Sequence, residues 1–284
     1  MTEVLVYATA SRAQTARALL GAACRATDIG VRLELYGSGS LYQRLGPRHA
    51  PPLPDVVLWL GPFAAQSAGL DGLLQPYQPA SVAAAALHDP KWYWTTLDYR
   101  PIGVVGPTGV QNLQDLAGVP GVAMADPERS EVGLSILLAT LDRARQRDGD
   151  VERAWTWWVQ RAARGLVLAE EDPDALAIVS DGGASHALTV AETAAPVPGL
   201  APIPHAVGLA ANSPHPAAAK RLLDWLTSDA AGDTLKYSPW RAATNGLEAL
   251  LSAAPPLDVE WCRQNYTATR RRWAASGFGP QLTG

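Results

Sequence analysis

The sequence predicts an α/β protein whose parallel sheets are covered by helices on both faces. Apolar strand-like segments at residues 4–7, 29–36 and 55–60 are separated by helix-like segments, which is the order of βαβ units in a parallel sheet. Hydrophobic residues make up 48% of the 284 residues and charged residues 18%. This globular composition and length suit one large domain or two lobes of ordinary size.

The strands of the first third end in loops of small or hydroxyl-bearing residues. The expected order is a strand at 4–7, a loop at 8–11, a helix from about 14 to 27, a strand at 29–36, a loop at 37–40, a helix-like segment at 41–45 and a strand at 55–60, closed by Gly61. Small side chains at strand ends allow a ligand to approach the backbone.

The rest of the chain continues the alternation. We expect strands at 102–105, 121–125, 175–179 and 205–211, helices at 112–116, 132–145, 151–164, 216–227 and 258–275, and a connection at 191–204. A loop of residues 126–130 follows the second of these strands, and a loop of residues 180–183 follows the third.

Charge and cysteine content restrict the function classes. The formal net charge is −4 and the chain has no basic stripe, so nucleic acid is not an expected partner. Cys24 and Cys262 lack metal-ligand spacing, and either a long-range disulfide or two free thiols would fit them. No apolar run reaches the length of a membrane span, and no signal peptide precedes Val4. A cytoplasmic protein and a secreted one that has lost its leader both remain open.

The motifs of common enzymes are absent from the sequence. It contains no HExxH, no GxSxG, and no complete phosphate-binding glycine loop around residues 37–40. The acidic residues at 170–174 are interpreted as a solvated turn, and His186 as a cap or surface residue. We therefore expect no catalytic residues, no metal and no cofactor.

Aromatic residues are a second candidate source of ligand contacts. The chain has ten tryptophans, and Trp94, Tyr237 and Trp240 fall in predicted loops, where they could form the walls of a cleft. Trp155 and Trp158 instead share one face of a predicted helix, which favours core packing.

The order of these segments resembles the type II periplasmic solute-binding proteins of ABC transporters, in the iron, thiamine, phosphonate and polyamine branch. The similar segments are residues 5–7 at the first strand, 27–31 at the second, the loop at 37–41, the strand at 55–59, 73–77, Asp126 and Pro127 with Ser130 and Gly133, and the helix at 216–226. The likeness spans most of the chain, and each motif alone is moderately specific.

The resemblance implies two lobes joined by two crossing segments that act as a hinge. Residues 1–98 with 205–284 would form lobe 1, and residues 99–204 lobe 2. A small solute would be clamped between them, with a transporter permease as partner and a monomeric receptor in the periplasm or at the cell surface. The ligand contacts implied are Thr9, Ser11, Ser38, Ser40, Gly61, Ser130 and Asp181, with Trp94, Tyr237 and Trp240 as walls.

The ligand class stays open at this stage. Hydroxyl-rich loops at helix N-termini favour an oxyanion-bearing metabolite such as a phosphonate, a phosphate ester or a carboxylate. The supply of Trp and Tyr would also suit a flat aromatic cation such as thiamine. Iron receptors of this branch use a consecutive tyrosine pair, which the sequence lacks, so ferric iron is disfavoured. Two other functions remain as alternatives: a two-lobed transferase or deaminase, and a ligand sensor without a transporter.

Overall fold

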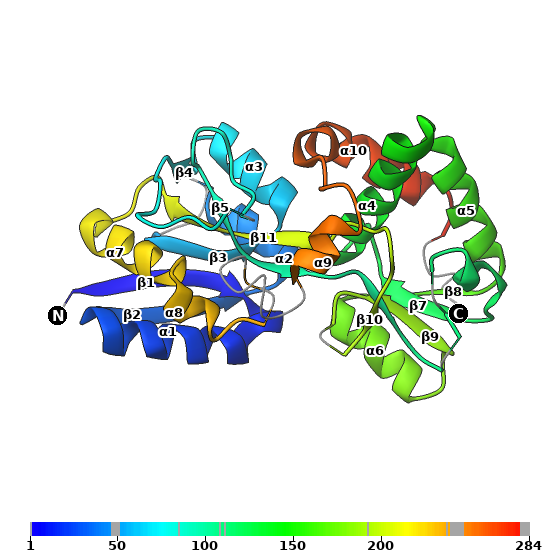
Figure 1. Ribbon diagram of the computed structural model, residues 1–284, viewed down its shortest axis with the longest axis horizontal. Coiled ribbons are helices and arrows are strands. Elements are labelled where there is room, and N and C mark those ends of the chain that lie inside the picture. The colour runs from blue at the N-terminus through cyan, green and yellow to red at the C-terminus, as the bar shows by residue number, and fades with distance from the viewer. Residues whose placement is uncertain are drawn as a thin grey trace. The chain divides into compact units, whose positions relative to one another are not determined.

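The computed structural model describes residues 2–46, 52–84, 86–107, 109–110, 112–191, 193–236, 238 and 247–278, apart from the side chains of Ser38 and Gly39. The chain folds into two compact units, each with its own sheet (Figure 1). Unit 1 comprises residues 1–99 and 204–248, and unit 2 comprises residues 100–203 and 249–284. No helix in the described parts of the chain is both long and apolar enough to cross a membrane.

The sheet of unit 1 has three adjacent parallel strands with antiparallel pairing beside them. Its elements are β1 (Glu3–Thr9), η1 (Ala10–Arg12), α1 (Ala13–Thr27), β2 (Gly30–Tyr36), α2 (Ser38–Arg44), β3 (Val56–Leu60), α3 (Pro62–Leu70), β4 (Leu74–Gln75), β5 (Thr95–Arg100), β11 (Ile203–Ala210), α7 (Pro216–Leu226) and α8 (Asp229–Gly232). The order is β2-β1-β3-β11-β4, and β5 also pairs with β11. β1 is parallel to both β2 and β3, whereas β11 runs antiparallel to β3.

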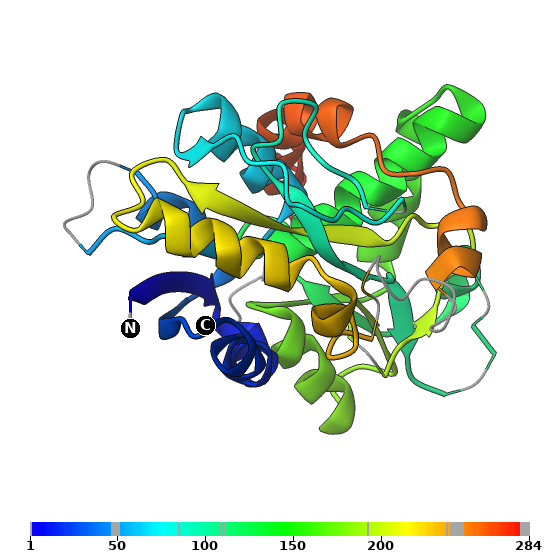
Figure 2. The ribbon, with the colours of Figure 1, turned by 60° about the vertical axis from the view of Figure 1, so that its left-hand side comes forward.

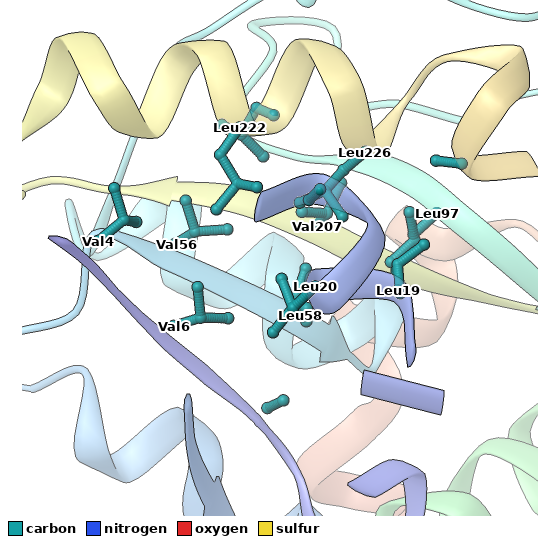
Figure 3. Close-up of a cluster of buried hydrophobic side chains, with 14 of the residues drawn as sticks. Val4, Val6, Leu19, Leu20, Val56, Leu58, Leu97, Val207, Leu222 and Leu226 are labelled. Carbon is teal, nitrogen blue, oxygen red and sulfur yellow. The ribbon is translucent and has the colours of Figure 1, made fainter. Parts of the chain in front are cut away.

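One face of this sheet is buried against α1 and α7. Alternate β1 residues such as Val4 and Val6 enter the same hydrophobic cluster as Leu58 of β3 and Leu222 of α7 (Figure 3). Figure 2 shows α7, in yellow, running along β11. The apolar faces of both helices are thus removed from water by one sheet, which fixes the strand register.

Unit 2 repeats this plan with a second sheet. Its elements are β6 (Gly103–Val105), η2 (Asp115–Gly118), β7 (Val122–Ala125), α4 (Glu131–Asp148), α5 (Glu152–Ala163), β8 (Leu166–Ala169), α6 (Asp172–Ser180), β9 (His186–Thr189), β10 (Ala195–Pro196) and α10 (Val259–Ala275), while α9 (Leu247–Ser252) contains the boundary between the units. The order is β10-β6-β9-β7-β8; β7 is parallel to β8 and β9, and β6 is antiparallel to β9.

Tryptophans hold α4, α5 and α10 together. Trp158 of α5 is fully buried, as expected, and donates to Thr140 Oγ1 over 2.8 Å. Trp273 of α10 packs edge-on against Trp158 with ring centroids 5.6 Å apart, and its Nε1 donates to Asp126 Oδ1 over 3.2 Å. Figure 1 shows α10 beside α4. The contacts are internal to unit 2.

The C-terminal segment is a correction to the expected division. The sequence placed all of residues 205–284 in the first lobe, whereas residues 249–284 belong to unit 2. Besides Trp273, two ion pairs anchor this segment: Arg145 to Asp258 at 2.8 Å and Arg272 to Glu152. The chain therefore passes between the units three times, at 99/100, 203/204 and 248/249, rather than twice.

A second correction concerns residues 175–179, which are helical and not a strand. They lie in α6, which begins with a capping box in which Glu171 and Asp174 each accept from the other's backbone N–H. The acidic residues at 170–174 are thus a helix start and not merely a solvated turn. His186, expected at the surface, is buried in β9 at 7% exposure.

Asp172 in the first turn of α6 is nearly buried. Its Oδ2 accepts the Thr189 hydroxyl at 2.7 Å, and burial raises the pKa of its carboxyl above the ordinary value. Its ionised form therefore carries a cost inside unit 2 at neutral pH.

Replacing Trp273 tests the docking of α10. We expect Trp273→Ala to lower the free energy of unfolding by roughly 3–5 kcal/mol, because a large buried side chain and its hydrogen bond are lost. Guanidinium denaturation measures the change. Arg271→Ala, at an exposed position of the same helix, is the control and should cost little. A cost below about 1 kcal/mol for Trp273→Ala would contradict this packing.

Asp172→Asn tests the buried carboxyl by its pH dependence. A raised folded-state pKa gives stability that is present below the unfolded pKa and is lost as pH rises through the folded pKa. We therefore expect the unfolding free energy of the variant, relative to that of the unmodified protein, to be higher at pH 7 than at pH 4. Urea unfolding at the two pH values measures the difference. Glu260→Gln is the opposite-sign control, because the hydrogen bond from Arg263 lowers the pKa of Glu260. If the relative unfolding free energies of both variants changed in the same direction between pH 4 and pH 7, the raised pKa of Asp172 would be refuted.

Candidate functional site

The carboxyl ends of three parallel strands meet at one edge of the unit 1 sheet. Thr9 pairs with Tyr36 at the end of β1 and β2, and Ala8 pairs with Leu58 near the end of β3. The antiparallel β11 begins at the same edge, where Ala206 pairs with Leu60. In open α/β sheets this is the edge at which ligands bind.

The predicted site residues of unit 1 lie at this edge and differ in their exposure and in their hydrogen bonds. Thr9 is 6% exposed, and its hydroxyl makes no hydrogen bond within the part of the chain described. Ser11 is exposed in η1. The Ser40 hydroxyl donates to the Gly37 carbonyl at 3.0 Å, so part of its capacity is used locally. Ser38 begins α2, and its side chain lies outside what the structure describes.

Gly61 forms the entry to α3. It is the N-cap residue, it is followed by Pro62 at the first helical position, and no side chain caps the helix. Its carbonyl accepts from Ala65 N at 2.8 Å. Gly61, Pro62 and Phe63 are buried, and no side chain of the N-cap residue occupies the N-terminus of the helix.

Ser130 in unit 2 is satisfied by its own surroundings. It is the N-cap of α4, with Oγ accepting from Gly133 N at 3.5 Å and donating to Glu171 Oε2 at 3.1 Å. Its residue exposure is 2%, and the carboxylate of Glu131 is also buried in the first turn. The positive end of this helix therefore already faces carboxylates of the chain itself.

Asp181 does not share an edge with Ser130. The strand-tip interpretation of this residue is wrong, since Asp181 is the C-cap of α6 and its N–H donates to Ala177 O at 2.9 Å. α6 leads into the start of β9, which is parallel to β7, whereas Ser130 follows the end of β7. The two residues thus lie toward opposite edges of the unit 2 sheet, and the helix C-terminus disfavours an anion at Asp181.

The expected aromatic walls are only partly described. Trp94 is 4% exposed, and its Nε1 donates to Gln66 Oε1 at 2.9 Å, so its ring is part of the packing of unit 1. Tyr237 and Trp240 lie outside the described residues. Cys24 and Cys262 are free thiols, which settles the disulfide question left open by the sequence. No cluster of three or more potential metal ligands occurs among the residues described.

A buried charged cluster at this edge was missed by sequence reasoning. Arg12, at the end of η1, forms an ion pair with Asp98 of β5, and both side chains are at most 8% exposed. His205 of β11 brings its Nδ1 to 3.4 Å from Asp98 Oδ1. The Arg12 guanidinium also lies 5.0 Å from the ring centroid of Trp59. Arg12 follows the small loop 8–11 directly, and a charged residue at that position was the available signal.

Trp59 adds local backbone strain to the same edge. Its φ is 56°, in the left-handed region that a bulky residue rarely adopts, and its indole Nε1 is buried without a hydrogen-bond acceptor in the described structure. Such strain persists where surrounding contacts impose it, and it concentrates at functional sites. The edge of unit 1 therefore combines a strained aromatic residue, a buried ion pair and a hydroxyl without a described partner.

Asp98→Asn tests the cluster. Removing the carboxylate charge leaves the Arg12 guanidinium buried without its counterion, so we expect a loss of roughly 3–5 kcal/mol in unfolding free energy, measured by chemical denaturation. The control is Glu152→Gln, which weakens an exposed pair with Arg272 and should cost less than about 1 kcal/mol. Equal, small costs for both variants would show that the cluster is not a buried ion pair in solution.

Solved structures share this fold over almost the whole chain. The apo ferric ion-binding protein A of Pasteurella haemolytica is 15% identical, with a TM-score of 0.78, 99% of this chain and 100% of that chain covered. The periplasmic binding protein AfuA of Actinobacillus pleuropneumoniae, with fructose-6-phosphate bound, is 14% identical with a TM-score of 0.78, covering 97% and 98%. A periplasmic thiamin binding protein is 19% identical with a TM-score of 0.75, covering 96% of each chain.

The family is established by sequence. No curated protein matches the chain. The model of the family described as bacterial extracellular solute-binding protein matches residues 4–238, which is most of the chain. With the fold of the solved binding proteins, this match confirms the resemblance seen in the sequence. The chain belongs to the bacterial extracellular solute-binding proteins and has the two-lobed fold of the type II periplasmic receptors.

Proposed function

We propose that this protein is the extracytoplasmic receptor of an ABC uptake transporter, which clamps a small oxyanion-bearing solute between its two units. The observation that carries the proposal is the edge of unit 1, where β1 ends at Thr9 and the parallel β3 ends just before Gly61, in a member of a solute-binding family. Closure would follow from a ligand that binds the closed state better than the open one.

An oxyanion is favoured by the chemistry of this edge. The N-cap residues of α3 and α1 are Gly61 and Arg12, and neither helix has a side-chain cap. Uncapped helix N-termini stabilise phosphate or carboxylate oxygens. AfuA, which shares the fold, was solved with a sugar phosphate, and a phosphate ester or phosphonate is the class we propose here.

An aromatic cation such as thiamine is the second candidate. It is supported by the ten tryptophans and by the fold shared with a thiamin-binding protein. Trp59 and Trp94 argue against it, because they are 2% and 4% exposed and offer little ring surface for stacking.

The proposed receptor role also implies a location, an oligomeric state and a set of partners. The family and the solved structures are binding proteins, so we propose a monomeric receptor without catalytic activity, situated in the periplasm or at the cell surface. Its partners would be the solute and a transporter permease, with no nucleic acid partner. Turnover of any bound solute would point instead to the transferase or deaminase alternative.

A thermal-shift panel tests the ligand class. Phosphate esters, phosphonates, thiamine, polyamines and ferric iron are compared at equal concentration, and we expect a phosphate ester or phosphonate to give the largest stabilisation. A ligand at a hundredfold its Kd stabilises the folded state by about 2.7 kcal/mol. Thiamine or a polyamine as the best stabiliser would overturn the oxyanion assignment while leaving the receptor role intact.

The site itself is tested by Thr9→Val against Thr267→Val. The first variant removes a hydroxyl at the sheet edge with little change in shape, and we expect affinity for the best ligand to fall roughly tenfold, since a hydrogen bond to a charged group is worth about 1.5–3 kcal/mol. Thr267 is exposed on α10 and is the matched control. Isothermal titration calorimetry gives both affinities. Equal affinities would place the ligand elsewhere.

A further inference from the structure

Unit 2 contains a cavity that is separate from its strand edges. It has a volume of about 370 Å³ and lies between α4, α5 and the segment 198–200. Its lining residues are Leu113, Gln114, Thr140, Arg143, Ala144, Arg147, Arg153, Ala154, Thr156, Trp157, Gln160, Pro198, Gly199 and Leu200. This volume falls within the range of small-molecule sites in proteins.

The charge of the cavity lining is positive. Three arginines and no carboxylate are found among the described residues that line it. Arg147 and Arg153 both pair with Asp148, at 2.7 and 3.2 Å. Arg143 is half-buried and makes no ion pair with any residue that the structure describes. Asp148 also interacts electrostatically with Arg143, so one carboxylate faces three arginines and the site keeps a net positive charge, which attracts anions.

Trp157 supplies both an apolar wall and an unused donor. Its indole Nε1 is buried and has no hydrogen-bond acceptor in the described parts of the chain. Buried indole N–H groups are normally hydrogen-bonded, so this one calls for an acceptor from outside the chain. Together with Leu113, Ala144 and Leu200, the ring contributes apolar surface to the cavity lining.

Gly199 allows Arg143 to reach its position. A Cβ at residue 199 would lie 3.2 Å from Arg143 Nη2, and the φ of Gly199 is 79°, a conformation that other residues rarely adopt. The guanidinium therefore lies against a backbone surface that only glycine provides. This arrangement keeps the guanidinium at the cavity, where its electrostatic interaction is with Asp148, a carboxylate already paired with Arg147 and Arg153.

We propose that this cavity is a second binding site, for a small organic anion with a carboxylate or phosphate group on a planar apolar body. Arg143 binds the anionic group, and Trp157 contacts the apolar body and donates its N–H. The site is distinct from the sheet edges, because Thr140 lies ten residues along α4 from Ser130, about 15 Å at the helical rise. The inference does not depend on the solute bound at the edge of unit 1.

Calorimetric titration of the full chain with benzoate and phenyl phosphate tests the proposal, with benzyl alcohol as the uncharged comparison. We expect measurable binding of at least one anion and binding of benzyl alcohol at least about tenfold weaker, since charge-assisted hydrogen bonds are roughly twice as strong as neutral ones. Arg143→Gln should weaken the anion about tenfold or more. Trp157→Phe replaces the indole by a smaller aromatic ring without an N–H, and it should weaken binding severalfold.

Thr267→Val and Arg271→Gln are the matched controls. Both residues are exposed on α10, away from the cavity lining. Neither variant should change the affinity for the anion, and each variant's melting temperature shows whether it is folded. The proposal is overturned if neither anion binds up to millimolar concentration, if benzyl alcohol binds as well as the anions, or if folded Arg143→Gln and Trp157→Phe bind the anions as well as the unmodified protein does.

Discussion

The ion pair between Arg12 and Asp98 is the interaction on which the arrangement of unit 1 depends. Arg12 follows β1, and Asp98 lies in β5 immediately before the chain enters unit 2. His205, near Asp98, lies immediately after the chain returns. Because a buried charge must keep its counterion, this cluster holds the sheet edge and both of these chain crossings in one register.

Local pattern was sufficient to predict most of the fold. Apolar runs that alternate with helical periods identified β1, β2, β3 and α7, because a strand buried on both faces and a helix buried on one face leave different spacings. The hydroxyl-bearing loops of unit 1 follow from the same pattern: parallel strands place their carboxyl ends at one edge, so Thr9 at the end of β1 and Gly61 after β3 lie at the same edge of the sheet.

Long-range pairing was what the sequence could not reveal. Arg12 and Asp98 are 86 positions apart, and although Arg12 stands out by its position directly after a strand-end loop, nothing in the sequence pairs it with Asp98. Residues 175–179 are a short apolar run that suits a strand or a buried helix equally, and the capping box of Glu171 and Asp174 decides for the helix. The last helix joined unit 2 because Trp273 finds a buried place against Trp158, a contact without a sequence signature.

The two units contribute unequally to the proposed recognition of an oxyanion. In unit 2, the predicted contact at Ser130 is already occupied by Glu171, and Glu131 lies in the same first helical turn. In unit 1, α3 has a bare N-terminus, and the Thr9 hydroxyl has no described partner. Carboxylates repel a second anion, so the charge recognition that we propose is assigned to unit 1. On this argument, the specificity of the receptor depends on the strand ends of unit 1.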